Sequence, residues 1–257
     1  MRKMIDSHIH LDHYKDNEIR DMISSSSFIH SLITVSFNSE SAQRNLTLSE
    51  QYPKVKPAFG FHPEQPLPTD EELKTLIDWM EFHKEKAVAI GEVGLPYYLR
   101  QESATTSFSL QGYIELLETF IILAKRWDKP IVLHAVYDDA PIVCDLLEKH
   151  SVQKAHFHWF KGDSLTVNRI INNGYFISFT PDIVYEKEIQ ELAKGYPIDQ
   201  MMVETDGPWP FEGPFQDQLT HPHMMSESIA MISKLKEMPI QDVYHHLLHN
   251  TKSFYCI

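Results

Sequence analysis

The 257-residue sequence has few cysteines and no long apolar run, and each shortage argues against a class of protein. Its two cysteines, Cys144 and Cys256, cannot build a disulfide framework, so we expect a reducing, cytoplasmic environment. No apolar run approaches the roughly 18 residues that a membrane-spanning helix needs. The first residues, Met1 to His8, also lack the apolar stretch of a secretory signal. We therefore expect no membrane partner.

Basic residues are also scarce, with 23 Lys and Arg against 36 Asp and Glu and a formal net charge of −13. This balance argues against a basic surface that follows a nucleic-acid backbone. It leaves open a phosphate substrate that is held locally by metal ions. The hydrophobic content of 42% and the charged content of 23% are ordinary for a globular protein and exclude disordered and fibrous classes. The unusual count is histidine, with 15 residues.

The chain has no repeat, low-complexity tract or Gly/Ser linker that would divide it, so we predict a single domain over residues 1–257. Eight short apolar runs, rich in β-branched residues, have the pattern of strands buried on both faces. They are Ile5–Ile9, Leu32–Phe37, Val55–Phe61, Ala87–Ile90, Ile131–Leu133, Ala155–Phe157, Tyr175–Phe179 and Met201–Val203. Eight is the number of strands that closes a parallel barrel.

The segments between these runs have the period of helices. Thr69 and Glu72 form a capping-box pattern, and an apolar stripe at helical spacing runs from Leu110 to Ala124. Alternation of strands and helices favours a parallel sheet with helical crossovers. An open doubly wound sheet would show the same alternation, but the sequence contains neither G-x-G-x-x-G nor a P-loop. The predicted fold is therefore α/β, a (β/α)₈ TIM barrel.

The first predicted strand ends in a pair of histidines, His8 and His10. Strand side chains alternate, so both imidazoles point to one face, about 7 Å apart along the chain. Two imidazoles so placed can reach one metal ion. Taken alone, the pair is more often a pair of ordinary structural histidines than a metal site.

Four more predicted strands end in a histidine or a carboxylate, and these residues are Glu92, His134, His158 and Asp206. The carboxyl ends of the strands are where a parallel barrel assembles its catalytic site. Four imidazoles and two carboxylates make two ligand sets, provided that one carboxylate bridges. The pattern predicts a dinuclear metal site.

These residues lie in blocks that resemble the TatD family of metal-dependent hydrolases, within the amidohydrolase-like superfamily of barrels. The blocks run in family order over residues 4–208: Asp6-Ser-His-Ile-His-Leu-Asp12, Gly60-Phe-His-Pro63, Gly91-Glu-Val-Gly-Leu95, Pro130 to His134, His158-Trp-Phe-Lys-Gly162 and Glu204-Thr-Asp206. Each block is weak alone, but the ordered set is specific.

The resemblance implies a role for each matching residue. His8 and His10 would hold the first metal ion with Asp206, Glu92 would bridge, and His134 and His158 would complete the second site. His62 would lie at the rim and touch the leaving group or a phosphate oxygen. The implied reaction is hydrolysis of a phosphodiester, usually in DNA.

The chemistry of the residues agrees with these roles. Two neighbouring cations can lower the pKa of a shared water, and Asp206 is the best placed general base. Imidazole and carboxylate ligands suit Zn, Mn, Fe or Co better than an all-oxygen Mg cage, and the choice among divalent ions stays open. Nothing in the sequence indicates an obligate protein partner.

Several positions depart from the family pattern around the substrate. They are Pro96 in place of aspartate, Val136 in place of arginine, Trp159-Phe160-Lys161 in place of small residues, and Thr220-His-Pro-His223 in place of Arg-Asn-x-Pro. Two alternatives therefore stay open: an amidohydrolase or esterase acting on a small neutral molecule, and a non-catalytic metalloprotein. Lys161, Arg100, Trp159, Trp209 and Tyr97 could still hold a nucleotide by charge and stacking, or could only pack in loops.

Overall fold

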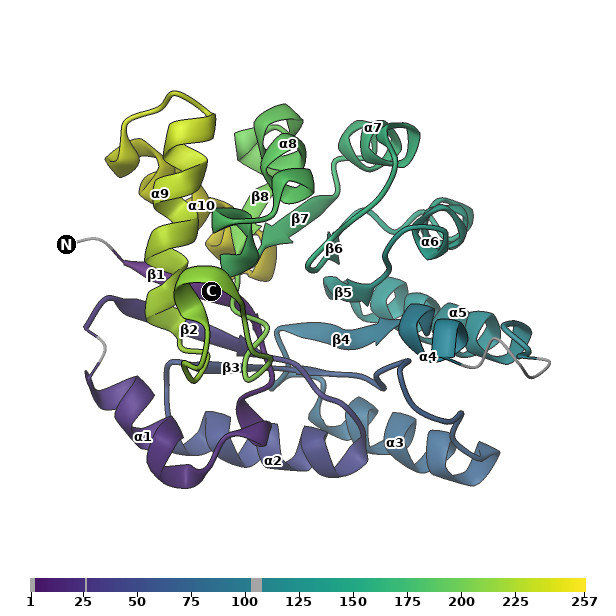
Figure 1. Cartoon of the computed structure of the whole chain (residues 1–257). Coiled ribbons are helices and arrows are strands. Elements are labelled where there is room, and N and C mark those ends of the chain that lie inside the picture. The colour runs from purple at the N-terminus through teal and green to yellow at the C-terminus, as the bar shows by residue number, and fades with distance from the viewer. Residues whose placement is uncertain (1–2, 26, 103–107) are drawn as a thin grey trace.

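The computed structural model describes residues 3–25, 27–102 and 108–257. Eight parallel strands form one sheet in chain order, and helices surround them on the outside (Figure 1). The strands are β1 (Met4–Ile9), β2 (Ile29–Thr34), β3 (Val55–Phe59), β4 (Ala89–Gly94), β5 (Ile131–His134), β6 (Ala155–Phe157), β7 (Phe176–Phe179) and β8 (Met201–Val203). This architecture confirms the predicted (β/α)₈ barrel.

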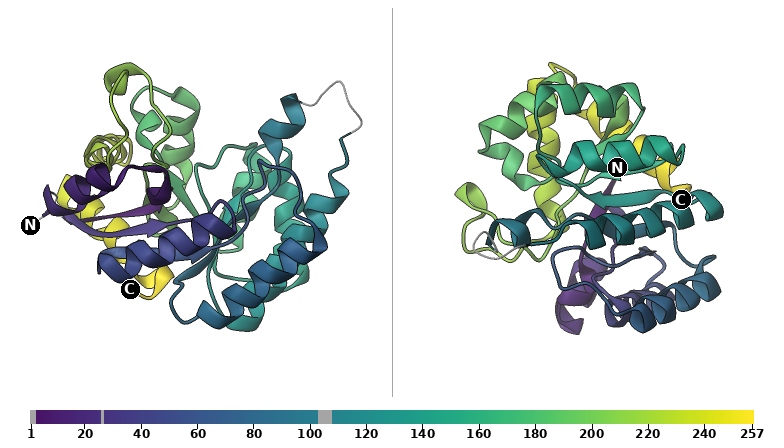
Figure 2. Two further views of the ribbon diagram at one scale, coloured as in Figure 1. Left: turned by 90° about the horizontal axis from the view of Figure 1, so that it is seen from below. Right: turned by 90° about the vertical axis from the view of Figure 1, so that its right-hand side faces the viewer.

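Helices alternate with the strands and cover the outer face of the sheet, as the three views of Figures 1 and 2 show. They are α1 (Asp16–Ser25), α2 (Ser39–Gln51), α3 (Asp70–His83), α4 (Tyr97–Glu102), α5 (Gln111–Trp127), α6 (Asp139–Lys149), α7 (Ser164–Asn172), α8 (Lys187–Gly195), α9 (Met225–Leu235) and α10 (Ile240–Tyr255). None of the described helices is both long and apolar enough to cross a membrane.

Local sequence signals explain where helix α3 begins and where helix α5 ends. Thr69 and Glu72 form a complete capping box at the start of α3, as the sequence predicts. Helix α5 ends where Asp128 adopts a left-handed conformation with φ 51°, just before Lys129-Pro130. The helix that was expected from Leu110 to Ala124 is therefore present with slightly different ends.

Two strands differ by more than two residues from the ranges expected from the sequence. Strand β2 begins at Ile29 and ends at Thr34, so Val35 to Phe37 lie beyond its ladder. These residues still run towards the site, because the Val35 N–H bonds to the Ile9 carbonyl and the Ser36 N–H bonds to the Gly91 carbonyl. Strand β4 begins at Ala89 and extends to Gly94, so Glu92 lies inside the strand and not after its end. Apolar runs alone could not fix these limits.

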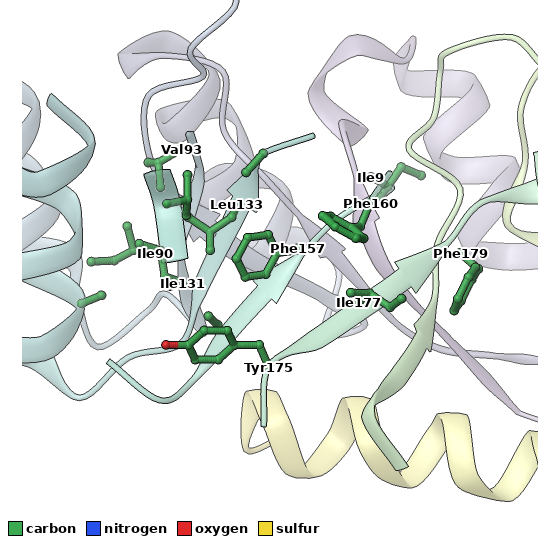
Figure 3. Packing of buried hydrophobic residues seen from close by; sticks show 14 of the residues in the cluster. Ile9, Ile90, Val93, Ile131, Leu133, Phe157, Phe160, Tyr175, Ile177 and Phe179 are labelled. Atoms are coloured by element: carbon green, nitrogen blue, oxygen red, sulfur yellow. The ribbon is translucent and has the colours of Figure 1, made fainter. Parts of the chain in front are cut away.

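The two faces of the strands contribute to two different cores. The outer face packs against the helices through residues such as Ile131, Leu133, Phe157 and Ile177 (Figure 3). The inner face forms a smaller cluster that fills the barrel: Ile5, Ile33, Val35, Ala58, Ala89, Val132, Met202, Phe254 and Tyr255. The last two residues come from the end of α10. This helix therefore places an aromatic pair inside the barrel.

Candidate metal centre

Two β-bulges turn the side chains of His8 and Glu92 into the barrel. On β1, Asp6 pairs with Leu32 and Ile9 with Thr34, so β1 has one residue more than β2 between these pairs. On β4 the same excess lies between Ile90 and Val93. An extra residue reverses which face the following side chains occupy. Without the bulges, strict alternation from Ile5 and Ala89 would turn His8 and Glu92 to the other face.

The first strand and the segment after β8 are held together at the site by hydrogen bonds. The Asp206 N–H donates to the His8 carbonyl at 2.9 Å, and the His10 N–H donates to the Gly207 carbonyl at 2.8 Å. The Asp6 carboxylate accepts from the Thr205 N–H at 3.0 Å and from the Thr205 hydroxyl at 2.5 Å. These bonds place Asp206 beside the two histidines of β1.

The first cluster consists of His8, His10 and Asp206 around one oxygen of Glu92. Glu92 Oε2 lies 3.1 Å from His8 Nε2 and 3.3 Å from His10 Nε2. Asp206 Oδ1 lies 3.2 Å and 3.5 Å from the same two nitrogens. Among the described residues, His8 Nε2, Glu92 Oε2 and Asp206 Oδ1 have no partner with hydrogen-bond geometry, although all three are buried.

These distances fit donor atoms that share one metal ion. Atoms that each lie about 2.0–2.2 Å from a zinc ion are roughly 2.8–3.6 Å apart for tetrahedral to octahedral angles. The four distances of the first cluster lie in that interval. Buried polar atoms that approach closely without bonding to one another need another partner. A cation at their common point would satisfy all of them.

The second cluster consists of His62, His134 and His158 around the other oxygen of Glu92. Glu92 Oε1 lies 2.7 Å from His158 Nε2, 3.1 Å from His134 Nδ1 and 3.3 Å from His62 Nε2. His134 Nδ1 and His158 Nε2 are 3.2 Å apart. The Glu92 carboxylate therefore faces one group of ring nitrogens with each oxygen, as a bridging ligand must.

The charges of the site favour bound positive charge. Burial opposes ionisation of Glu92, but the imidazoles of His158, His62 and His8 outweigh it and hold its pKa well below the usual value. Burial and His158 oppose protonation of His8, yet the carboxylates of Glu92 and Asp206 raise its pKa to about 9. The carboxylates thus stabilise a cation here, whether a proton or a metal ion.

His62, for which the resemblance implies a place at the rim, lies in the second cluster. Its side chain is only 9% exposed and its Nε2 atom faces Glu92. Its Nδ1 atom accepts the Glu64 N–H at 3.1 Å, so the proton of a neutral ring lies on Nε2. Burial lowers the pKa of His62 to about 4, which keeps the ring neutral at working pH.

Two carboxylates outside the predicted ligand set lie on the outer side of His134 and His158. Glu64 Oε1 lies 3.1 Å from His134 Nε2, opposite the nitrogen that faces Glu92. Glu204 Oε1 lies 3.7 Å from His158 Nδ1. Such partners fix the orientation of metal-binding imidazoles. The sequence contains a signal for both, because each lies two residues from a predicted site residue: Glu64 follows His62, and Glu204 precedes Asp206.

The groups expected to contact a substrate are arranged around the clusters, but the two basic side chains among them, Arg100 and Lys161, are already paired with carboxylates. Arg100 Nη2 lies 2.7 Å from the buried Asp139, and Lys161 Nζ lies 3.9 Å from the buried Asp182. The Arg100 guanidinium also lies over the Tyr97 ring, and Lys161 lies over Trp159. The remaining aromatic group, Trp209, is 45% exposed, and its ring centroid lies 6.4 Å from that of His10.

Comparisons with known proteins agree with this arrangement. The sequence profile described as TatD related DNase matches residues 5–256. An uncharacterized metal-dependent hydrolase from Haemophilus influenzae is 41% identical over 253 residues, covering 98% of this chain and 99% of that protein. Human Deoxyribonuclease TATDN3 is 28% identical, covering 93% of this chain and 90% of that protein.

A solved structure shares the fold along the whole chain. The crystal structure of YjjV, a TatD homologue from Escherichia coli, superposes with a TM-score of 0.86 at 24% identity. The match covers 100% of this chain and 99% of that one. The barrel, the paired clusters of residues that could hold metal ions and the family profile lead to one conclusion. This chain belongs to the TatD family of metal-dependent hydrolases.

Proposed function

We propose that this protein hydrolyses phosphodiester bonds, in DNA or a nucleotide, with two divalent metal ions bridged by Glu92. The observation that carries the proposal is the position of the Glu92 carboxylate between two clusters of ring nitrogens. In this proposal the first ion is held by His8, His10 and Asp206, and the second by His134 and His158. Bound ions would activate a water molecule and neutralise the charge of the reacting phosphate.

The other groups of the site have roles that their positions support. Asp206 has two carboxylate oxygens, so one can bind the first ion while the other accepts a proton from the attacking water. His62 carries its proton on Nε2 and can donate it in a hydrogen bond to a substrate oxygen. Burial of both side chains, 5% and 9% exposed, limits competition from bulk water.

A DNA or nucleotide substrate is supported by the family and by one relative. The matching family is described as related to DNases, and human TATDN3 is named a deoxyribonuclease. We also propose a cytoplasmic location, because the two cysteines suit a reducing compartment.

A second candidate is hydrolysis of a small neutral ester or cyclic amide. The pairing of Arg100 with Asp139 and of Lys161 with Asp182 favours it, because a cation already neutralised by a carboxylate attracts a phosphate weakly. Both candidates use the same metal centre and differ only in the substrate.

A substrate panel separates the two candidates. The protein, loaded in turn with Mn²⁺, Zn²⁺ or Co²⁺, is tested on labelled single-stranded DNA, bis(p-nitrophenyl) phosphate, a lactone and a cyclic amide. Turnover of the phosphodiesters that is lost in Glu92→Gln supports the proposal. Turnover of only the lactone or amide selects the second candidate. Activity that survives in Glu92→Gln would exclude the proposed site for either reaction.

A further inference from the structure

The barrel interior contains a line of buried polar side chains that starts at the last helix and ends at the metal centre. Tyr255 Oη of α10 lies 2.8 Å from His156 Nδ1, and His156 Nε2 lies 2.6 Å from Ser178 Oγ. Ser178 Oγ lies 2.5 Å from Glu204 Oε2. All four side chains are at most 2% exposed. Polar groups this deep among apolar residues are retained at a cost unless each is fully bonded.

The direction of every proton in this line follows from its end. Ser178 donates its single hydroxyl proton to Glu204 Oε2. His156 must then donate from Nε2, which leaves Nδ1 as an acceptor for the Tyr255 hydroxyl. This pattern requires a neutral ring with its proton on Nε2, and both ring nitrogens lie within hydrogen-bond distance of a hydroxyl oxygen. The Ser7 carbonyl, at 3.3 Å, is the more distant of the two acceptors of Tyr255.

The far end of the line reaches a histidine of the second cluster. Glu204 Oε1 accepts the Trp159 N–H at 2.7 Å and lies 3.7 Å from His158 Nδ1. His158 Nδ1 is buried and has no hydrogen-bond partner among the described residues, while its Nε2 faces Glu92 at 2.7 Å. Glu204 is thus the carboxylate that can fix the ring, and its own position depends on Ser178.

We propose that Tyr255, His156 and Ser178 hold Glu204 in the place from which it orients His158, so that Tyr255 is a positioning residue for the second metal ion. We call Tyr255, His156, Ser178 and Glu204 the Tyr255 relay. The inference rests on the proposed role of His158 as a metal ligand. It connects the end of α10 to a centre at the opposite end of the strands, through side chains that never touch the substrate.

The relay predicts weaker metal binding when it is cut, graded by position. Loss of a partner next to a ligand typically lowers metal affinity 10- to 100-fold. We expect a decrease of about tenfold or more for Ser178→Ala, which frees Glu204 directly. For Tyr255→Phe we expect a smaller decrease, of about three- to tenfold, because His156 and Ser178 remain.

The test compares these variants with a matched control, Tyr196→Phe. Tyr196 is fully buried and donates its hydroxyl to the Tyr175 carbonyl at 2.8 Å, outside the relay. The dissociation constants of both ions are measured by titrating metal-free full-length protein with Zn²⁺ against a chelator. Urea unfolding of the metal-free proteins, and the ¹⁵N shifts of His156 as a readout of its tautomer, are recorded in parallel.

The expected result has three parts. One of the two ions binds more weakly in Ser178→Ala and Tyr255→Phe, and Tyr196→Phe binds both like the wild type. The double variant, Ser178→Ala with Tyr255→Phe, binds metal no more weakly than Ser178→Ala alone. Once Ser178 no longer bonds to Glu204, the loss of Tyr255 has no further effect on Glu204. His156 also carries its proton on Nε2 in the wild type.

Two results would overturn the relay. One is wild-type metal affinity in Tyr255→Phe, with a loss of stability similar to that of Tyr196→Phe, which would make Tyr255 purely structural. The other is a fully additive double variant. Failure of the wild type itself to bind two ions would instead remove the proposed metal centre, and the relay with it.

Discussion

Glu64 provides a test of how the second cluster is held. Its Oε1 atom receives the Tyr98 N–H at 2.8 Å and faces His134 Nε2 at 3.1 Å, and its Oε2 atom receives the Leu99 N–H at 2.6 Å. Burial opposes its ionisation, but His134 and these donors outweigh burial and lower its pKa. An ionised Glu64 keeps the proton of a neutral His134 on Nε2 and leaves Nδ1 free to bind metal.

Glu64→Gln keeps the size of the side chain but replaces one acceptor with a donor. One of the three contacts must then be lost or reversed, and a hydrogen bond to a charged group contributes about 1.5–3 kcal/mol. We expect the ion of the second cluster to bind about 10- to 100-fold more weakly, which corresponds to about 1.4–2.8 kcal/mol. Turnover should recover at saturating metal, because His134 itself is still present.

The assay is competition with a chelator, and Glu72→Gln is the control. Glu72 also accepts a backbone N–H, from Thr69 in the capping box of α3, but it lies on an exposed surface. The control should lose some stability and no metal affinity. Equal metal affinity in Glu64→Gln and the wild type would refute the claim that Glu64 orients His134.

Two further predictions concern the backbone and the pH dependence of the metal-free protein. A Cβ at Gly94 would lie 1.9 Å from the His134 carbonyl oxygen. Gly94→Ala should therefore lower the free energy of unfolding, measured in urea, by about 1–3 kcal/mol. The control Gly195→Ala, with open space at its Cβ, should be neutral or slightly stabilising. Burial raises the pKa of Asp6 from 3.8 to about 7, so its contribution to stability is present below pH 4 and is lost as pH rises to 7. Asp6→Asn cannot ionise, so relative to the wild type its unfolding free energy should improve between pH 4 and 7, by at most about 1.4 kcal/mol per pH unit. An unchanged difference across this range would contradict the raised pKa.

The fold could be predicted largely because its signal is repeated along the chain. Each apolar run such as Ile131–Leu133 is short and is followed by a helical segment, and eight such units leave few alternatives. The limits of β2 and β4 could not be predicted, because the hydrogen bonds that end a ladder join residues far apart in sequence. Val35 is as apolar as Ile33, but it lies beyond the ladder between β2 and β3. Its N–H bonds instead to the Ile9 carbonyl.

The sequence predicts which strand ends carry the candidate ligands, but it does not predict which way all of their side chains point. Residues that follow apolar runs gather at the carboxyl end of a barrel, which is why His134 and His158 stood out. The side chains of His8 and Glu92 point inward because of the two bulges, and the hydrophobic periodicity of the sequence does not reveal a bulge.

The supporting residues were harder to find than the ligands. Glu64 lies in a loop after β3, and His156 and Ser178 lie within apolar runs, where a polar residue is easily taken for an ordinary buried group. Alternation offers a partial signal for the last two. His156 shares a face with His158, and Ser178 lies on the neighbouring strand between His156 and Glu204.

The central claim is that one carboxylate bridges two metal ions. Elemental analysis of the purified wild type, Glu92→Gln and the exposed-histidine control His245→Ala tests it most directly. We predict about two divalent ions per chain in the wild type and in His245→Ala, and clearly less than two in Glu92→Gln, with all three proteins folded. Equal metal content in Glu92→Gln and the wild type, or no bound metal in the wild type after incubation with Mn²⁺ and Zn²⁺, would contradict the account.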